Sequence, residues 1–362
     1  MPQMDQMERV EMSYEVGRGL NSEIIEKIKS TPQLLKYVQS DGVILGIRND
    51  YFNIYYRGAS IGKFSYSKGQ DEFICSVSGK YARDNSGKNK GSVTLSLNDF
   101  FDREKELKAC IDTRILESDN WKEKSVQSKL VQKNNSNINS AWYCVDIEYV
   151  MQRRSKQETC YGRFDITALS KKANEYGKYT VALIEVKCGS SAYGGKGDLC
   201  LAGAEKINPD TYIGTAGSGL LGHMFDYNRF LASEAMKCQL RRELAEIINN
   251  QRDLGICRNW ANGIDADEID DDFQVYFLTF NADSQTRKAF CGYMFNEPIS
   301  ITGIPGKSRV SEYNIEKMFG ADITTASKFS NYHFWFSESL GDDISDILDA
   351  KSYHDVWGKT CS

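Results

Sequence analysis

The sequence lacks any run of 18 or more apolar residues, so it predicts no membrane-spanning helix. It lacks a basic segment followed by an apolar run near Met1, so no secretory signal is expected. Only three histidines occur, and none of the ten cysteines forms a C-x-x-C pair, which argues against a zinc site. We therefore expect reduced, half-buried cysteines in a cytoplasmic protein.

An excess of basic residues is also lacking. The chain has 45 Lys and Arg against 50 Asp and Glu, a net charge of −5. This balance argues against a protein that coats nucleic acid through a broad basic face. It does not exclude a nuclease, because a catalytic centre needs acidic groups. The acidic run at 265–272 lacks the glycine and terminal glutamate of a calcium loop, so a solvated loop is expected there.

The length of 362 residues allows one large domain or two smaller ones. The hydrophobic pattern predicts an α/β protein with a mixed central sheet flanked by helices. An N-terminal β-rich module is expected over residues 1–115, and a second domain over 116–362. The predicted elements are a helix at 21–38 interrupted at Pro32, a β-meander at 42–66, helices at 98–114, 120–133 and 220–250, and strands at 142–152, 161–170, 179–188 and 273–280.

The most informative residues lie on two neighbouring predicted strands. Glu185 and Lys187 follow the apolar run 181–184, and Asp165 lies on the preceding strand. Residues i and i+2 of a strand share a face, so Glu185 and Lys187 point the same way. Charged groups at the end of an apolar strand are costly to bury unless they are paired or bind a metal. The alternative is a cross-strand ion pair on a solvated sheet face.

A metal-dependent reaction would explain this combination of residues. Two adjacent carboxylates repel each other unless a cation neutralises them, and a hard cation such as Mg²⁺ prefers oxygen ligands. Such an ion lowers the pKa of bound water and stabilises charge on a phosphate. The ammonium of Lys187 would orient the water and add positive charge where the transition state is negative.

With Asp165 followed by Glu185-Val186-Lys187, the sequence resembles the PD-(D/E)XK, or restriction-endonuclease-like, nuclease superfamily. That pattern places an Asp on one strand and Glu-x-Lys on the next hairpin strand, with a helix before and a helix after. Phe164 stands where the family name has Pro. The resemblance covers about residues 120–280, and it implies a restriction-endonuclease-like core in which Asp165, Glu185 and Lys187 are catalytic.

The resemblance also implies further site residues on the flanking helices. An acidic residue on the first helix is often a metal ligand, and Glu123 is the candidate beside Asp165 and Glu185. A Gln-x-x-x-Tyr pair is common on the second helix of one branch, and His223 and Tyr227 have that spacing here. Glu123 as a solvated residue, His223 as a helix-start residue and Tyr227 as a core residue remain open alternatives.

Two further basic residues are candidates for substrate binding. Arg163 either holds a phosphate or pairs with Asp165. Lys196 lies in a glycine-rich segment at 189–222, which is predicted to be a mobile lid. This segment lacks the full phosphate-loop pattern G-x-x-x-x-G-K-[ST], so nucleotide binding is not expected.

These observations predict a metal-dependent hydrolase, a nuclease that cleaves phosphodiester bonds of DNA with Mg²⁺ or Mn²⁺. The expected partner is nucleic acid, and no membrane association is expected. Whether the protein forms a homodimer is left open. A rival hypothesis is a non-catalytic nucleic-acid-binding or scaffold module that retains the nuclease fold, as in a bacterial defence or mobile-element system.

Overall fold

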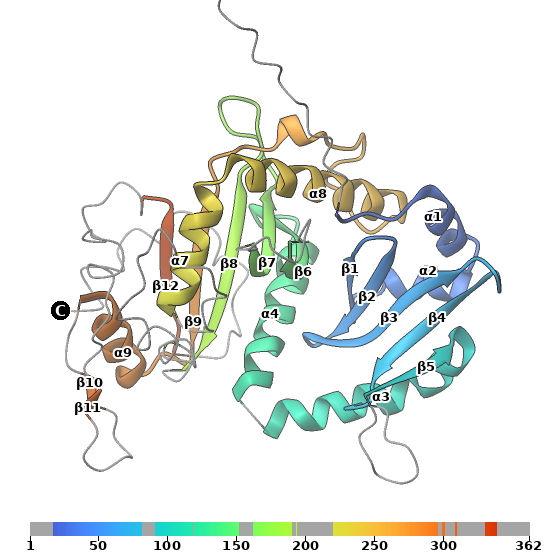
Figure 1. Ribbon diagram of the computed structural model, residues 1–362, viewed down its shortest axis with the longest axis horizontal. Helices are drawn as coiled ribbons and strands as arrows, with labels where there is room; N and C mark the ends of the chain where they lie inside the picture. Colours follow the sequence, from blue (N-terminus) through green and yellow to red (C-terminus); the bar gives the residue numbers. More distant parts are fainter. Residues whose placement is uncertain are drawn as a thin grey trace, which may run out of the picture.

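The computed structural model describes residues 17–81, 91–117, 119–151, 162–189, 193, 220–295, 299–300, 308–309 and 330–338. Within these residues the protein is mixed α/β, with two five-stranded sheets (Figure 1). Helix α4 lies between the two sheets, and α8 crosses one end of the assembly (Figure 1). No helix in the described ranges has the length and apolar character needed to span a membrane.

The first sheet is the antiparallel meander that the sequence predicts, extended by two strands. Its order is β1-β2-β3-β4-β5. Helix α1 begins after Asn21, whose side chain accepts a hydrogen bond from Ile24 N, and Pro32 occupies the first turn of α2, where a missing N–H costs nothing. The elements are α1 (Ser22–Lys29), α2 (Pro32–Val38), β1 (Ile44–Ile47), β2 (Tyr51–Tyr56), β3 (Ala59–Ser67), β4 (Glu72–Ser78), β5 (Ser92–Ser96) and α3 (Leu97–Glu117).

The second sheet has the order β12-β9-β8-β7-β6. Strands β6, β7 and β8 are antiparallel, β9 adds to β8 in parallel, and β12 adds to β9 in parallel. Its elements are α4 (Asp119–Ser136), β6 (Trp142–Val150), β7 (Arg163–Ser170), β8 (Val181–Cys188), α7 (Leu220–Leu231), α8 (Glu234–Asp253), a 3₁₀ turn η1 (Ala266–Glu268), β9 (Gln274–Phe280), α9 (Ser284–Phe295) and β12 (Tyr332–Phe336). A separate hairpin pairs β10 (Ile299–Ser300) with β11 (Ser308–Arg309).

Each face of this second sheet is covered by different helices. Val126 and Leu130 of α4 pack with Ile166 and Ile184 on one face. On the other face, the Phe164 ring packs against the rings of Tyr227 and Phe230 of α7, and α8 covers β6. Strand β8 is buried along its whole length because both faces are covered. Glu185 and Lys187, near the end of β8, therefore lie in the interior.

The structure corrects the helix predicted at 220–250, adds detail at two other predicted features and covers only part of a third. The single helix predicted at 220–250 is two helices, because Ser233 starts α8 by accepting a hydrogen bond from Met236 N. The acidic run contains the turn η1 with a capping box at Asp265. The boundary at 115/116 falls inside the last turn of α3. The predicted lid at 189–222 lies outside the described residues except for Gly189, Tyr193 and 220–222, the last three being the start of α7.

Of the seven cysteines in the described residues, six are reduced, as expected, and one is not. The free thiols are Cys75, Cys110, Cys144, Cys188, Cys238 and Cys257. Cys291 of α9 is disulfide-bonded. Burial raises the pKa of the Cys75 thiol to about 12, which suits an inert core residue.

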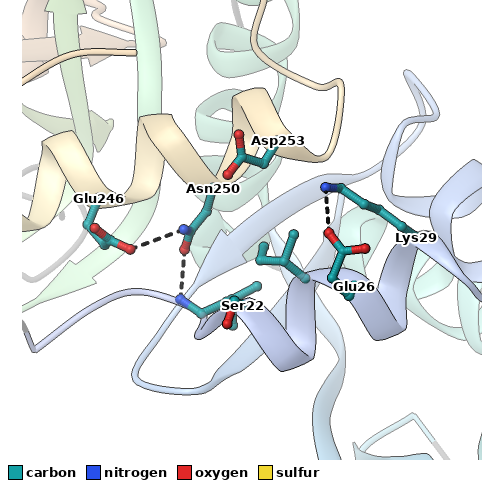
Figure 2. A pocket seen from close by; sticks show the side chains of 8 residues that line it. Ser22, Glu26, Lys29, Glu246, Asn250 and Asp253 are labelled. Atoms are coloured by element: carbon teal, nitrogen blue, oxygen red, sulfur yellow. Dashed lines mark hydrogen bonds and ion pairs between the residues drawn. The ribbon is translucent and has the colours of Figure 1, made fainter. Parts of the chain in front are cut away.

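The first helix joins α8 across a small hollow of about 240 Å³ (Figure 2). Asn250 of α8 accepts a hydrogen bond from Leu20 N at 2.7 Å and donates one to Glu246 at 3.1 Å. Lys29 and Glu26 pair with each other on the opposite wall at 2.9 Å. None of the predicted site residues lines this hollow, so it marks the junction between the N-terminal helix and α8.

Candidate active site

Asp165 lies where strands β7 and β8 part. Their register runs from Leu169–Val181 to Ile166–Ile184. Beyond that point Val186 N donates to the carboxylate Oδ2 of Asp165 at 2.8 Å. The side chain thus accepts a hydrogen bond from the neighbouring strand. This contact fixes Asp165 beside the Glu-x-Lys segment, as the sequence predicts.

Glu185 and Lys187 form an ion pair in the interior of the protein. Their residues are 3% and 4% exposed, and the Lys187 ammonium bonds to Oε1 of Glu185. The alternative of a solvated surface pair is therefore wrong. The register places Lys187 opposite Thr279 of β9, so the pair lies in the middle of the sheet order. A buried pair of this kind needs further hydrogen bonds to offset the cost of dehydration.

Helix α7 supplies those hydrogen bonds. The Tyr227 hydroxyl donates to Oε2 of Glu185 at 2.5 Å, and Nε2 of His223 lies 3.1 Å from Oε1. One helical turn separates the two residues, so both reach the same carboxylate. Tyr227 is fully buried and packs on Phe164, which makes it a core residue and a site residue together. His223 and Tyr227 thus meet the predicted site.

Glu123 of α4 comes within electrostatic range of the same group. Burial, partly offset by Lys187 and reinforced by Glu185, raises its pKa to about 7. Burial, Glu185 and Glu123 hold the pKa of Asp165 well above its usual value. Three carboxyl groups and one ammonium therefore share this part of the protein, and the three carboxyls cannot all ionise at low cost without more positive charge.

The charged partners favour one carboxylate over the others. Burial would raise the pKa of Glu185, but His223, Lys187 and the Tyr227 hydroxyl outweigh it and lower the pKa. Burial would lower the pKa of the Lys187 ammonium. The nearby carboxylates, with Glu185 first, outweigh burial and raise this pKa. Glu185 and Lys187 are therefore the ionised pair, while the environment of Asp165 and Glu123 favours protons or a cation.

The two substrate-binding candidates stand differently. Arg163 is exposed at the start of β7. Burial raises the pKa of Asp226 on α7 to about 7, although the charge of Arg163 acts to lower it. Among the described contacts, no ion pair joins Arg163 to Asp165. Phosphate binding therefore remains the hypothesis for Arg163. Lys196 lies outside the described residues.

Sequence reasoning missed Glu148. Ile147 pairs with Ile166 and Tyr149 with Phe164, so Glu148 is the residue of β6 opposite Asp165. Glu148 has a φ of 53°, rare for a residue with a side chain, and its carboxylate pairs with Lys124 of α4. The signal was present: Asp146 and Glu148 are charged residues at i and i+2 in an apolar strand, as Glu185 and Lys187 are.

The donor set is one that a hard divalent cation takes. Asp165, Glu123 and Glu185 offer carboxylate oxygens from β7, α4 and β8, with no sulfur among them. Over the described ranges, however, no three His, Cys, Asp or Glu side chains are already arranged to hold an ion. Both oxygens of Glu185 are engaged by protein groups. The residue types fit Mg²⁺ or Mn²⁺, and Glu185 would have to exchange a protein partner for the ion.

No protein-family model, no curated protein and no solved structure matches the chain.

The Tyr227 hydroxyl gives a first prediction. Tyr227→Phe should lower the free energy of unfolding by about 1–3 kcal/mol, because Oε2 of buried Glu185 loses its hydrogen-bond donor. Urea denaturation measures this difference. Tyr176→Phe is the control, since Tyr176 is 78% exposed. Equal stability of the two variants would mean that water or another donor satisfies Glu185.

Proposed function

We propose that the chain is a metal-dependent nuclease of the PD-(D/E)XK kind, which hydrolyses phosphodiester bonds of DNA. The observation that carries this proposal is the buried pair Glu185 and Lys187 with Asp165 on the adjacent strand and Glu123 within electrostatic range. Glu185 and Lys187 are buried, and Asp165 and Glu123 are partly buried beside them, which is unfavourable for a purely structural core. Such groups at perturbed pKa are typical of catalytic sites.

The order of elements supports the proposal. Helix α4 precedes the antiparallel strands β6, β7 and β8, and helices α7 and α8 follow before β9 joins β8 in parallel. Asp165 lies on β7, the middle one of these three antiparallel strands, and the Glu-x-Lys segment lies on β8. This is the arrangement that the resemblance to a restriction-endonuclease-like core implies.

Each residue then has a role. Asp165, Glu185 and Glu123 would hold Mg²⁺ or Mn²⁺, which when bound lowers the pKa of water and neutralises charge on the phosphate. Lys187 orients the attacking water and places positive charge beside the phosphate. Tyr227 and His223 keep the Glu185 carboxylate in place. Exposed Arg163 holds a backbone phosphate.

A second candidate function rests on one observation. The Glu185 carboxylate is already satisfied by Lys187, His223 and Tyr227, so this ligand does not need a metal ion for its charge. That arrangement favours a nucleic-acid-binding or scaffold module that keeps the nuclease fold without catalysis. Such a module would bind DNA without taking up Mn²⁺ and without cleaving.

Metal binding separates the two candidates. The parent should bind Mn²⁺ in calorimetry. Asp165→Asn removes a proposed direct ligand, so it should weaken Mn²⁺ binding by at least the about 10–100-fold that follows loss of a residue that only supports a ligand. The matched control is Asp271→Asn, which neutralises an exposed carboxylate in the acidic run. Incubation with plasmid, single-stranded DNA and RNA, each with Mg²⁺, Mn²⁺ or chelator, then tests cleavage. Equal Mn²⁺ binding by the parent and Asp165→Asn would rule out the proposed metal site.

A further inference from the structure

The tip of the β2–β3 hairpin rests on the backbone of α4. Arg57 and Gly58 form the two-residue turn, with φ of 49° and 80°. Positive φ at both positions is what a tight hairpin with the normal strand twist requires. A Cβ on Gly58 would lie 1.9 Å from the carbonyl oxygen of Lys124, so only glycine allows this contact. The N-terminal sheet therefore touches α4 at the residue that follows Glu123.

The hairpin tip is anchored on its other side. Arg57 pairs with Asp112 of α3 at 2.8 Å, and the Tyr56 hydroxyl donates to the same carboxylate at 3.2 Å. These two contacts hold the turn against α3 while Gly58 holds it against α4. The turn therefore contacts α3 through side chains and α4 through the backbone.

Lys124 is held at its other end as well. Its ammonium pairs with Glu148, which lies opposite Asp165 in the sheet. The carbonyl of Lys124 meets the hairpin, and its side chain meets the strand beside the site. Glu123 is the adjacent residue of the same helix, so these two contacts fix the backbone of α4 next to the residue that interacts electrostatically with Lys187 and Asp165.

We propose that the β2–β3 hairpin is a positioning element of the active site, and that Gly58 is the positioning residue that sets the place of Glu123. The inference rests on the proposed function, because Glu123 matters to the site only as a ligand. The N-terminal sheet then acts in catalysis through α4, without touching substrate. A displacement of about an ångström at a ligand is enough to reduce activity strongly.

Gly58→Ala is the direct test, and Gly177→Ala is its matched control. Gly177 has a φ of 74°, close to that of Gly58, but no atom lies within 4 Å of the position of its Cβ. Both substitutions therefore carry the same backbone strain, and only Gly58→Ala pushes α4. Calorimetry with Mn²⁺ should show binding weakened by about 10–100-fold in Gly58→Ala, the range for loss of an outer-shell support. Gly177→Ala should bind Mn²⁺ as the parent does.

A second variant guards against failure of Gly58→Ala to fold. Glu148→Gln removes the charge that holds the Lys124 side chain, at a partly exposed position that tolerates the change. It should weaken Mn²⁺ binding in the same direction while thermal unfolding stays close to that of the parent. In cleavage assays both variants should lower kcat and leave KM for DNA unchanged, which a merely structural defect would not do.

The outcomes are distinct. Binding of Mn²⁺ by Gly58→Ala and Glu148→Gln at the parent affinity, in a protein where Asp165→Asn abolishes it, overturns the positioning role alone. Failure of the parent itself to bind Mn²⁺ overturns both this role and the proposed function. Weakened binding in Gly58→Ala with normal binding in Gly177→Ala supports the inference.

Discussion

Lys187→Met is expected to lower the cleavage rate by about 10²–10⁴-fold, the range for loss of a positioned acid–base or water-orienting group. Lys187 is the ammonium in the buried group, and methionine keeps its apolar length while removing the charge. The variant should retain Mn²⁺ binding, because all three carboxyl groups remain. Single-turnover cleavage of DNA with saturating Mn²⁺ measures the effect separately from product release.

Stability has to be measured beside activity for this variant. Removing one partner of a buried ion pair destabilises a protein by about 3–5 kcal/mol, although His223 and Tyr227 still support Glu185 here. Cleavage is therefore compared at a temperature where urea titration shows the variant to be folded. Lys178→Met, in the turn between β7 and β8, is the control for losing a lysine. Undiminished cleavage by folded Lys187→Met would reduce Lys187 to a structural partner of Glu185.

Asp146→Ala is expected to lower the free energy of unfolding by about 3–5 kcal/mol, since it leaves buried charges without their counter-ion. Asp146 of β6 accepts from Arg18 at 2.6 Å and from Arg48 at 2.8 Å. Both arginines belong to the N-terminal part of the chain and are buried. Arg18 also lies 4.2 Å from the ring centre of Tyr149. One carboxylate thus ties the segments around both arginines to the second sheet.

A surface pair gives the comparison for Asp146. Glu26 and Lys29 pair at 2.9 Å with exposed side chains, and Glu26→Ala should cost only about 0–1 kcal/mol. Urea denaturation of the parent and both variants measures the two differences. A cost for Asp146→Ala no larger than that for Glu26→Ala would show that water or Glu243, 3.8 Å from Arg18, takes over the charge.

Local sequence patterns predicted much of the second sheet and part of the site. Alternation of side chains along a strand put Glu185 and Lys187 on one face, and the hairpin between β7 and β8 brought Asp165 beside them. These contacts follow from short-range geometry and neighbouring strands. The break between α7 and α8 was missed because the apolar positions continue through it, and Ser233 was not weighed as a cap.

Only the tertiary structure decided which distant groups complete the site. The contacts of His223 and Tyr227 with Glu185 depend on how α7 lies across the sheet. The contact of Gly58 with Lys124 depends on how the first sheet packs on α4. Periodicity reports which face of an element is apolar, but not which other element covers it. The sequence by itself determined strands β6, β7, β8 and β9, the charged pair on β8 and the chemistry that this pair suggests. Packing decided that the pair is buried, because β8 has α4 on one face and α7 on the other.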